Sequence, residues 1–355
     1  MARWMYPLLA LGAAAIVGRV LGAPPFVVFA LAAAGLVPMA GLIGRSTEDL
    51  AFHVGPKWGG LLNATFGNAA ELIIGALALR EGLLPLVKAS ITGSIIGNSL
   101  LVLGTGVLVG GLRHGTQQFD AREATRNSTM MLIALASLVL PAAFAASEPD
   151  VLAVEEVSVG VAVLLLAVYV AYIVFSLTPA GHTMLEEEMG THVDEEERAP
   201  WSRRVAVLVL LGATIGTVVL AEALVGTVEA VTHALGWSQF FVGLVVVPLV
   251  GNIAEHFSAV QLAAKNKMET ALAIAAGSST QIALLVAPLL VLMSLLFGKW
   301  LDLVFHPLEI IAVGVAAFVF TLVSIDGETN WLEGVQLLAL YLMIAVVFFF
   351  LPLHA

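Results

Sequence analysis

The stretch Gly67-Asn68-Ala69-Ala70-Glu71 decides the fold, because it recurs later in the chain as Gly251-Asn252-Ile253-Ala254-Glu255. The two glutamates lie 184 positions apart, and at the same spacing Gly93-Ser94 matches Gly277-Ser278 without a gap. Each copy of this internal repeat therefore combines a Gly-Asn-x-x-Glu motif with a later Gly-Ser step.

The composition around these motifs is that of a membrane protein. Of the 355 residues, 60% are hydrophobic and 12% are charged, whereas soluble domains carry about a quarter charged residues. Apolar runs long enough to span a bilayer recur from end to end. The sequence contains no cysteine, so it forms no disulfide, and this does not fix the compartment.

These runs predict about eleven membrane helices. The first run, Trp4–Gly22, is followed at once by another, so we interpret it as a retained helix and not as a signal peptide. The predicted spans are 4–22, 24–43, 57–80, 84–111, 122–146, 155–178, 203–233, 239–264, 268–297, 303–324 and 331–352.

The two motifs fall in the third and the eighth of these helices, which cross the membrane in opposite directions. This is the inverted-repeat plan of many secondary transporters, whose substrate site lies near the membrane midplane where the repeats meet. We predict an all-α integral membrane fold with an extra N-terminal helix (1–22) and two inverted five-helix repeats (23–180 and 201–355). An acidic segment (181–200) joins the repeats.

The distribution of basic residues predicts the orientation, because cytoplasmic loops carry an excess of Lys and Arg. With the N-terminus in the cytoplasm, 11 of the 15 Lys and Arg residues lie on the cytoplasmic side. We therefore expect a cytoplasmic N-terminus and an external C-terminus, in a prokaryotic plasma membrane. The acidic segment then faces the cytoplasm, either as a solvated hinge or as a collector of cations.

Glu71 and Glu255 are the central candidates for a functional site. Both lie well inside predicted helices, where an ionised carboxylate is costly without a partner. Each has an asparagine three residues earlier on the same helix face, and a glycine before it that lets backbone carbonyls approach an ion. Such oxygen ligands suit Ca²⁺. The alternative is that the glutamates pair with basic residues and hold helices together. The predicted ion- and proton-binding residues are Glu71, Glu255, Asn68, Asn252, Gly67 and Gly251, with Glu71 and Glu255 as Ca²⁺ ligands.

Paired carboxylates also predict proton coupling. Without a cation, two like charges in a poor dielectric cannot both stay ionised, so the empty site takes up protons. If only a neutralised site crosses to the other face, Ca²⁺ and protons exchange, with about two protons per Ca²⁺ if each carboxylate takes one. Ca²⁺, protons and the lipid bilayer are then the partners, and no cofactor is expected.

Further polar residues complete the predicted site. They are Ser94 and Asn98 in the first half, and Ser278 and Gln281 on one helix face in the second. The serines also suit close helix packing, for which the long amides are not needed. His256 follows Glu255 and either relays protons or is a structural histidine.

Other classes of function have no support in the sequence. Basic clusters that would bind nucleic acid are absent, and no metalloprotease or other catalytic motif of recognised spacing occurs, so we expect no enzyme. A homo-oligomer is one of the assemblies that the sequence allows.

At these motifs the chain resembles the calcium/proton exchangers of the cation/calcium antiporter superfamily. The first signature is Leu61-Leu62-Asn63-Ala64-Thr65-Phe66-Gly67-Asn68-Ala69-Ala70-Glu71-Leu72-Ile73-Ile74. The second is Gly251-Asn252-Ile253-Ala254-Glu255-His256, followed by Ala264-Lys265-Asn266-Lys267-Met268 and Gly277-Ser278-Ser279-Thr280-Gln281-Ile282-Ala283-Leu284. The resemblance covers nearly the whole chain, and two copies in paired contexts are far more specific than one.

The resemblance implies the superfamily fold and proton-driven calcium export. It also implies that Glu71 and Glu255 bind the ion and protons in turn, and that Asn68, Asn252 and His256 contribute. The chain departs from the family pattern in three places, and these leave the ion preference open. Ala70 stands where relatives often have threonine, Ile253 where a smaller residue is common, and Glu269 where aspartate is frequent.

Three alternatives remain at this point. A sodium/calcium exchanger of the same superfamily is expected to have separate monovalent sites and different signatures. An antiporter of Mn²⁺, Na⁺ or K⁺ against protons would use similar oxygen ligands. A cation channel is disfavoured by the duplicated motifs and the paired acids, which are typical of a transporter.

Overall fold

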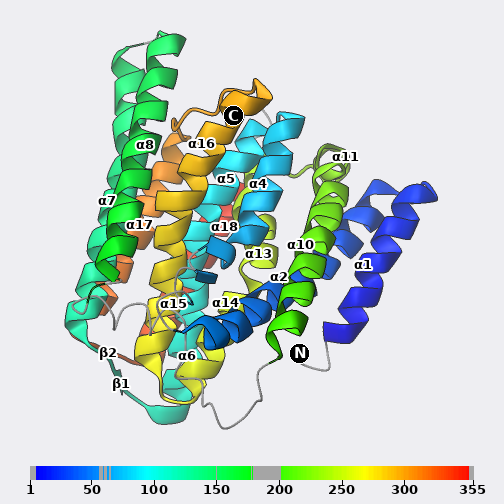
Figure 1. Ribbon diagram of the computed structural model, residues 1–355. Coiled ribbons are helices and arrows are strands. Elements are labelled where there is room, and N and C mark those ends of the chain that lie inside the picture. The colour runs from blue at the N-terminus through cyan, green and yellow to red at the C-terminus, as the bar shows by residue number, and fades with distance from the viewer. Residues whose placement is uncertain are drawn as a thin grey trace. The chain divides into compact units, whose positions relative to one another are not determined.

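The computed structural model is almost wholly helical (Figure 1). It describes residues 5–55, 59, 62, 63, 65–148, 150–176, 178 and 201–351, and the side chains of all of these except residues 5, 6, 123, 127 and 176. The predicted acidic segment 181–200 lies outside the described residues. Two short antiparallel strands, β1 (Gln117–Gln118) and β2 (Glu328–Thr329), accompany the helices. The prediction of an all-α membrane fold is therefore confirmed. Helices suit a membrane because they satisfy their own backbone hydrogen-bonding groups.

The predicted number of membrane helices is not confirmed. Within the described residues, eight helices are long and apolar enough to cross a membrane. A ninth span exists if Val228–Leu235 and Gln239–Gly251, which meet at a bend of 117°, form one broken crossing. The first predicted span contains a shorter apolar helix, Pro7–Val20, and the third begins partly outside the described residues.

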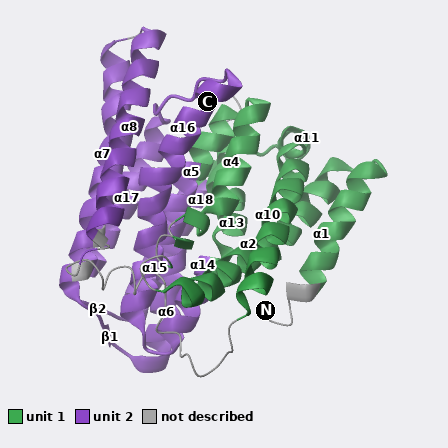
Figure 2. Cartoon of the chain, viewed as in Figure 1, with its two compact units in different colours: residues 1–90, 195–254, 347–355 green, residues 91–194, 255–346 purple. Residues whose placement is uncertain are grey.

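The chain divides into two compact units (Figure 2). The first is made of residues 1–90, 195–254 and 347–355, and the second of residues 91–194 and 255–346. Each unit thus draws on both predicted repeats, so the compact units are not the repeats themselves. The repeat boundaries stay a prediction.

The helices are distributed between the units as follows. The first unit contains α1 (Met5–Val20), α2 (Pro25–Val54), α4 (Ala69–Glu81), α10 (Arg203–Val225), α11 (Val228–Leu235), α12 (Gln239–Phe241), the π-helix η2 (Val242–Val246) and α13 (Val247–Gly251). The second contains η1 (Gly97–Val102), α6 (Leu103–His114), α7 (Ala121–Ser147), α8 (Val151–Ser176), α15 (Met268–Gln281), η3 (Ile282–Val286), α16 (Ala287–Phe297) and α17 (Pro307–Ser324). The division passes through α5 (Leu84–Ile96), α14 (Ile253–Ala264) and α18 (Trp331–Phe349).

In the first unit, α1, α2 and α10 pack closely through small residues. A Cβ atom on Gly35 of α2 would collide with the Cα of Gly12 in α1, and would lie 3.1 Å from Cδ1 of Leu220 in α10. Glycine therefore lets the backbones approach each other, as is common between membrane helices.

The end of α18 also belongs to the first unit. The hydroxyl of Ser238 donates to the carbonyl oxygen of Phe348 at 3.4 Å. The rings of Phe241 and Phe349 pack edge to face with centroids 5.1 Å apart. These contacts join the last turn of α18 to the start of α12.

In the second unit, α6 and α18 are in close backbone contact. A Cβ atom on Gly334 would collide with the backbone nitrogen of Leu108, and one on Gly104 would lie 2.9 Å from Cβ of Leu337. The β1 strand is anchored nearby, because the Gln117 amide donates to the Ala263 carbonyl at 3.0 Å.

Helix α2 is longer than predicted. The predicted span ended at residue 43, but the helix continues to Val54. The polar run that follows residue 43 is typical of a loop, yet the hydroxyls of Ser46 and Thr47 donate to their own helix, at Leu42 O (2.6 Å) and Ile43 O (2.9 Å). Bonds of this kind let polar residues stay helical when buried.

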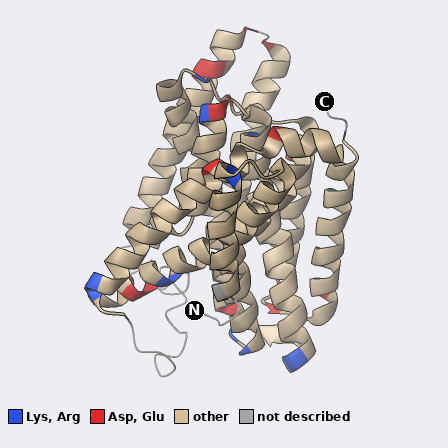
Figure 3. Ribbon diagram, turned by 90° about the vertical axis from the view of Figure 1, so that its right-hand side faces the viewer, with Lys and Arg blue, Asp and Glu red and all other residues tan. Residues whose placement is uncertain are grey.

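Charged residues are sparse along the helices and gather mostly towards helix ends (Figure 3). This is expected, since a charge inside the membrane is costly. Among the described residues the buried acids are Asp49, Glu71 and Glu309, with 3%, 7% and 0% of their surface exposed. These carboxylates are the first places to look for function.

Candidate ion-binding site

The first motif lies at the start of a helix and not in its interior. Helix α4 begins at Ala69, after a turn formed by Gly67 and Asn68. A Cβ atom on Gly67 would lie 2.6 Å from the carbonyl oxygen of Asn63, so glycine is required there. Glu71 consequently lies in the first turn of α4, where free backbone N–H groups favour a negative charge.

The second motif has the same local geometry. Helix α13 ends at Gly251, α14 begins at Ile253, and Glu255 lies in the first turn of α14. The Asn252 amide between them donates to the carbonyl oxygen of Pro248 at 3.1 Å. The prediction of one continuous helix over 239–264 was therefore wrong, because this side-chain bond stabilises a break in the helix.

Within the first unit, Glu71 of the first motif lies against Gly251 of the second. A Cβ atom on Gly251 would lie 2.7 Å from Oε1 of Glu71, so the carboxylate of one motif lies directly against the glycine of the other. Asn68 and Asn252 are also buried in this unit, with 3% and 1% of their surface exposed.

In the part of the chain that the structure describes, Glu71 is the site residue whose buried carboxylate most clearly lacks a compensating interaction. Neither of its carboxylate oxygens has a hydrogen-bond partner among the described residues, although both are buried. Burying a carboxylate without a partner is strongly unfavourable, so the group needs a cation or a proton. Either a cation or a proton would neutralise this carboxylate.

The second unit contains the supporting residues. Asn98, in η1, donates to the hydroxyl of Ser278, in α15, at 2.8 Å. The hydroxyls of Ser99 and Ser279 are 3.3 Å apart. Ser94 and Gln281 are buried in the same unit, with 1% and 5% of their surface exposed. Of the predicted polar residues, Asn98 of the first half and Ser278 of the second therefore meet where η1 packs against α15.

Glu255 and His256 belong to the second unit and are partly exposed. The Nε2 atom of His256 is buried and has no hydrogen-bond partner among the described residues. Glu71 belongs to the first unit, so the pairing of the two glutamates stays a prediction. No group of three or more His, Cys, Asp or Glu side chains suited to a metal forms in the described part of the chain.

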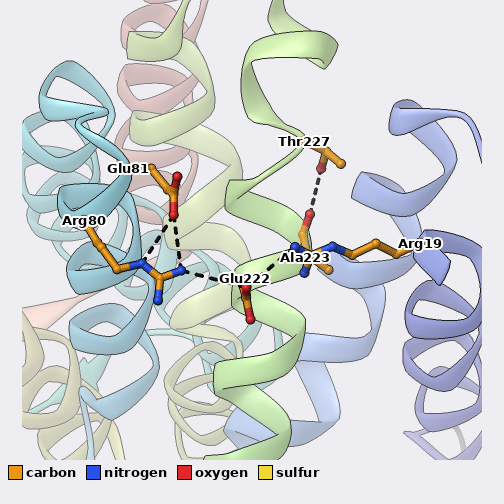
Figure 4. Close-up of polar contacts among 6 residues, drawn as sticks. All are labelled: Arg19, Arg80, Glu81, Glu222, Ala223 and Thr227. Atoms are coloured by element: carbon orange, nitrogen blue, oxygen red, sulfur yellow. Dashed lines mark hydrogen bonds and ion pairs between the residues drawn. The ribbon is translucent and has the colours of Figure 1, made fainter. Parts of the chain in front are cut away.

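Glu222 takes part in an ion-pair network in the first unit (Figure 4). Its Oε1 lies 3.6 Å from an Arg19 nitrogen and 3.8 Å from an Arg80 nitrogen, and Arg80 also pairs with Glu81 at 3.2 Å. All four side chains are about half exposed. Glu222 of α10 thus forms ion pairs with an arginine of α1 and an arginine of α4.

Two buried acids, Asp49 and Glu309, were not predicted from the sequence. Asp49 lies in the part of α2 that was expected to be a loop, with an Arg45 nitrogen 3.7 Å away. Glu309 accepts hydrogen bonds from the Thr92 hydroxyl at 2.8 Å and from the His306 backbone at 2.9 Å. The signal that could have found it is the Pro-x-Glu start of a helix, which is ordinarily only a capping pattern.

Comparison with known proteins agrees with this architecture. The sequence profile of the family described as sodium/calcium exchanger protein matches residues 24–178 and 205–350. A Ca²⁺/H⁺ antiporter of Synechocystis sp. is 42% identical over 344 residues, which cover 92% of this chain and 91% of that protein. The Ca²⁺/H⁺ antiporter ChaA of Bacillus subtilis is 41% identical over 337 residues, 95% of either chain.

A solved structure supports the same conclusion. The structure of native YfkE superposes with a TM-score of 0.86 at 38% sequence identity, and covers 98% of this chain and 100% of that one. The family match spans both halves of the chain, and the relatives are similar over nearly its whole length. The chain therefore belongs to the sodium/calcium exchanger protein family.

Proposed function

We propose that the protein is a secondary active antiporter that exchanges Ca²⁺ for protons. The observation that carries the proposal is the buried Glu71 carboxylate, which lies against Gly251 and has no hydrogen-bond partner among the described residues. The names of the relatives from Synechocystis and Bacillus subtilis, both Ca²⁺/H⁺ antiporters, support it.

In this proposal Glu71 and Glu255 bind Ca²⁺ and protons in turn. Carboxylate and amide oxygens are hard ligands of the kind that Ca²⁺ prefers, and Asn68 and Asn252 would add amide oxygens. When Ca²⁺ leaves, protons neutralise the two carboxylates. Charge balance then gives about two protons per Ca²⁺.

The site alternates between the two faces of the membrane. Inverted repeats with helices broken near the site are the usual basis of alternating access, and both motifs of this chain lie at the start of a helix after a turn. A further observation supports the repeat, since Ser279 donates to the carbonyl oxygen of Ile95 at 3.4 Å, and these positions are 184 apart. Contact between equivalent positions is what a two-fold relation between repeats produces.

We place the protein in a prokaryotic plasma membrane with a cytoplasmic N-terminus and an external C-terminus, following the excess of basic residues in one set of loops. The acidic segment 181–200 then connects the repeats on the cytoplasmic side. Ca²⁺, protons and the bilayer are the partners, and no cofactor or catalytic reaction is invoked.

The deciding experiment measures uptake of radioactive calcium into proteoliposomes under an imposed pH gradient. Wild-type protein is compared with Glu71→Gln and Glu255→Gln. We expect gradient-driven uptake that either substitution abolishes. Uptake that depends on sodium would instead indicate a sodium-coupled carrier, and single-channel currents would indicate a channel. Gradient-driven uptake by a variant that carries both Glu71→Gln and Glu255→Gln would exclude the two glutamates as the ion site.

A further inference from the structure

Glu309 is a buried carboxylate that the proposed exchange does not use. It lies in the first turn of α17, and none of its surface is exposed. Its Oε1 accepts a hydrogen bond from the Thr92 hydroxyl at 2.8 Å, and its Oε2 accepts one from the His306 backbone at 2.9 Å. Oε2 thus completes the capping box at the start of α17 itself, whereas Oε1 reaches a neighbouring helix.

The contact with Thr92 joins two distant parts of the chain. Thr92 lies in α5 and is fully buried. A threonine hydroxyl in a helix commonly bonds to its own preceding turn, as Thr217 does to Ala213 at 2.9 Å. Thr92 instead donates to the side chain of Glu309 on α17, so this hydroxyl joins two helices.

Helix α5 continues directly into the π-helix η1, which carries Asn98. A π turn contains an extra residue, so the rotation of the helix after it depends on whether the turn is kept. Before this turn α5 is held by the Thr92–Glu309 bond, and after it by the bond from Asn98 to Ser278 at 2.8 Å. The two bonds together fix which residue of the π turn points at α15.

We propose that Glu309 is a positioning residue for the exchanger. Through Thr92 it fixes α5 ahead of the π turn, so that Asn98 meets Ser278. The inference rests on the proposed function, in which Asn98 and Ser278 support ion binding. Glu309 itself does not touch the transported ion.

The test measures initial rates of gradient-driven calcium uptake against calcium concentration, with full-length protein in proteoliposomes. We expect Thr92→Val to raise the KM for Ca²⁺ about tenfold, equal to about 1.4 kcal/mol. Glu309→Gln should raise it by no more than this, because the amide keeps one acceptor oxygen. Turnover should stay within about twofold, because the loss is one of binding. Thr92→Ser keeps the hydroxyl and should restore the wild-type KM.

Thr217→Val is the matched control, because it removes a buried hydroxyl that bonds within its own helix. Its KM should equal that of the wild type. Asn98→Ala should itself raise the KM, and the variant that combines Thr92→Val with Asn98→Ala should be no worse than Asn98→Ala alone, since coupled residues are non-additive.

Several results would overturn the inference. An unchanged KM in Thr92→Val with a lowered Tm would show that the bond from Thr92 to Glu309 only stabilises the fold. Additive effects of Thr92→Val and Asn98→Ala on the KM would show that the two residues act independently. If Glu309→Gln does not fold, the comparison of Thr92→Val with Thr92→Ser decides. Absence of gradient-driven uptake in the wild type would instead refute the proposed function. The positioning role, which rests on that function, would then be refuted with it.

Discussion

Replacement of Gly251 by alanine tests the contact between the two motifs. The new Cβ atom would lie 2.7 Å from Oε1 of Glu71, 3.1 Å from Cδ and 3.3 Å from Cγ, whereas ordinary contacts begin at 3.4 Å. The carboxylate must therefore retreat by about 0.7 Å. Because the obstacle is the end of a flexible side chain, and alanine is favoured over glycine in helices by up to about 1 kcal/mol, the free energy of unfolding should change little.

The effect on ion binding should be much larger. Ca²⁺ is held at about 2.3–2.6 Å from its oxygen ligands, so a shift of this size removes an oxygen from the coordination shell. We expect the KM for Ca²⁺ to rise at least about tenfold, equal to about 1.4 kcal/mol. The assay is gradient-driven calcium uptake in proteoliposomes, with thermal unfolding of the same preparation.

Gly44→Ala is the matched control in the same unit, because its Cβ atom would meet only the Cβ of Ala254, at 3.8 Å. It should leave the KM unchanged, and its Tm should not fall, because alanine is favoured over glycine inside a helix. An unchanged KM in Gly251→Ala would refute the argument that Glu71 binds the ion while in contact with Gly251.

Three further substitutions test other contacts. Glu222→Gln should lower stability by less than about 1 kcal/mol, because its ion pairs are half exposed, and the difference should shrink in high salt when unfolding is followed at two ionic strengths. Gly334→Ala should lower the free energy of unfolding by about 1–3 kcal/mol or more, because the new Cβ atom would collide with the backbone of Leu108. The loss is measured as a lower Tm and as aggregation in size-exclusion chromatography. Asn266 has a φ of 62°, so Asn266→Val should lower the free energy of unfolding by about 1–3 kcal/mol more than Asn266→Gly, since both variants lose the hydrogen bond from the Gln117 amide and only valine is strained; thermal unfolding of the two variants measures the difference.

The residues of the two motifs could be found from the sequence alone. Glu71 and Asn68 stand out because they are polar in an apolar run, and the second copy confirms that the pattern is not accidental. The contact of Glu71 with Gly251 could not be found in this way. It depends on how segments 180 residues apart pack, and a repeat predicts only that they meet.

The hydropathy pattern also could not predict the breaks in the helices. The apolar run continues through Asn252, so a single helix over 239–264 was the natural prediction. The break depends on a bond between the Asn252 side chain and the Pro248 carbonyl, which hydropathy does not represent. The opposite error occurred in α2, where the polar residues after position 43 suggested a loop.

Glu309 is a third case in which the sequence predicts only part of what a residue does. Its position two residues after Pro307 is typical of a capped helix start, and that local role is indeed present. Its burial against Thr92 comes from a residue 217 positions earlier in the chain. The local pattern in the sequence is therefore enough to indicate the cap, which was not predicted, but it does not indicate the carboxylate's second partner.

The division of the first unit into three lengths of chain sets an order of events during biosynthesis. Residues 1–90 and 195–254 leave the ribosome long before residues 347–355, which complete the same unit. Until then Ser238 and Phe241 lack Phe348 and Phe349, their partners at the end of α18. The nascent chain must therefore keep this unit unfinished in the membrane while all of residues 255–346 are made and inserted.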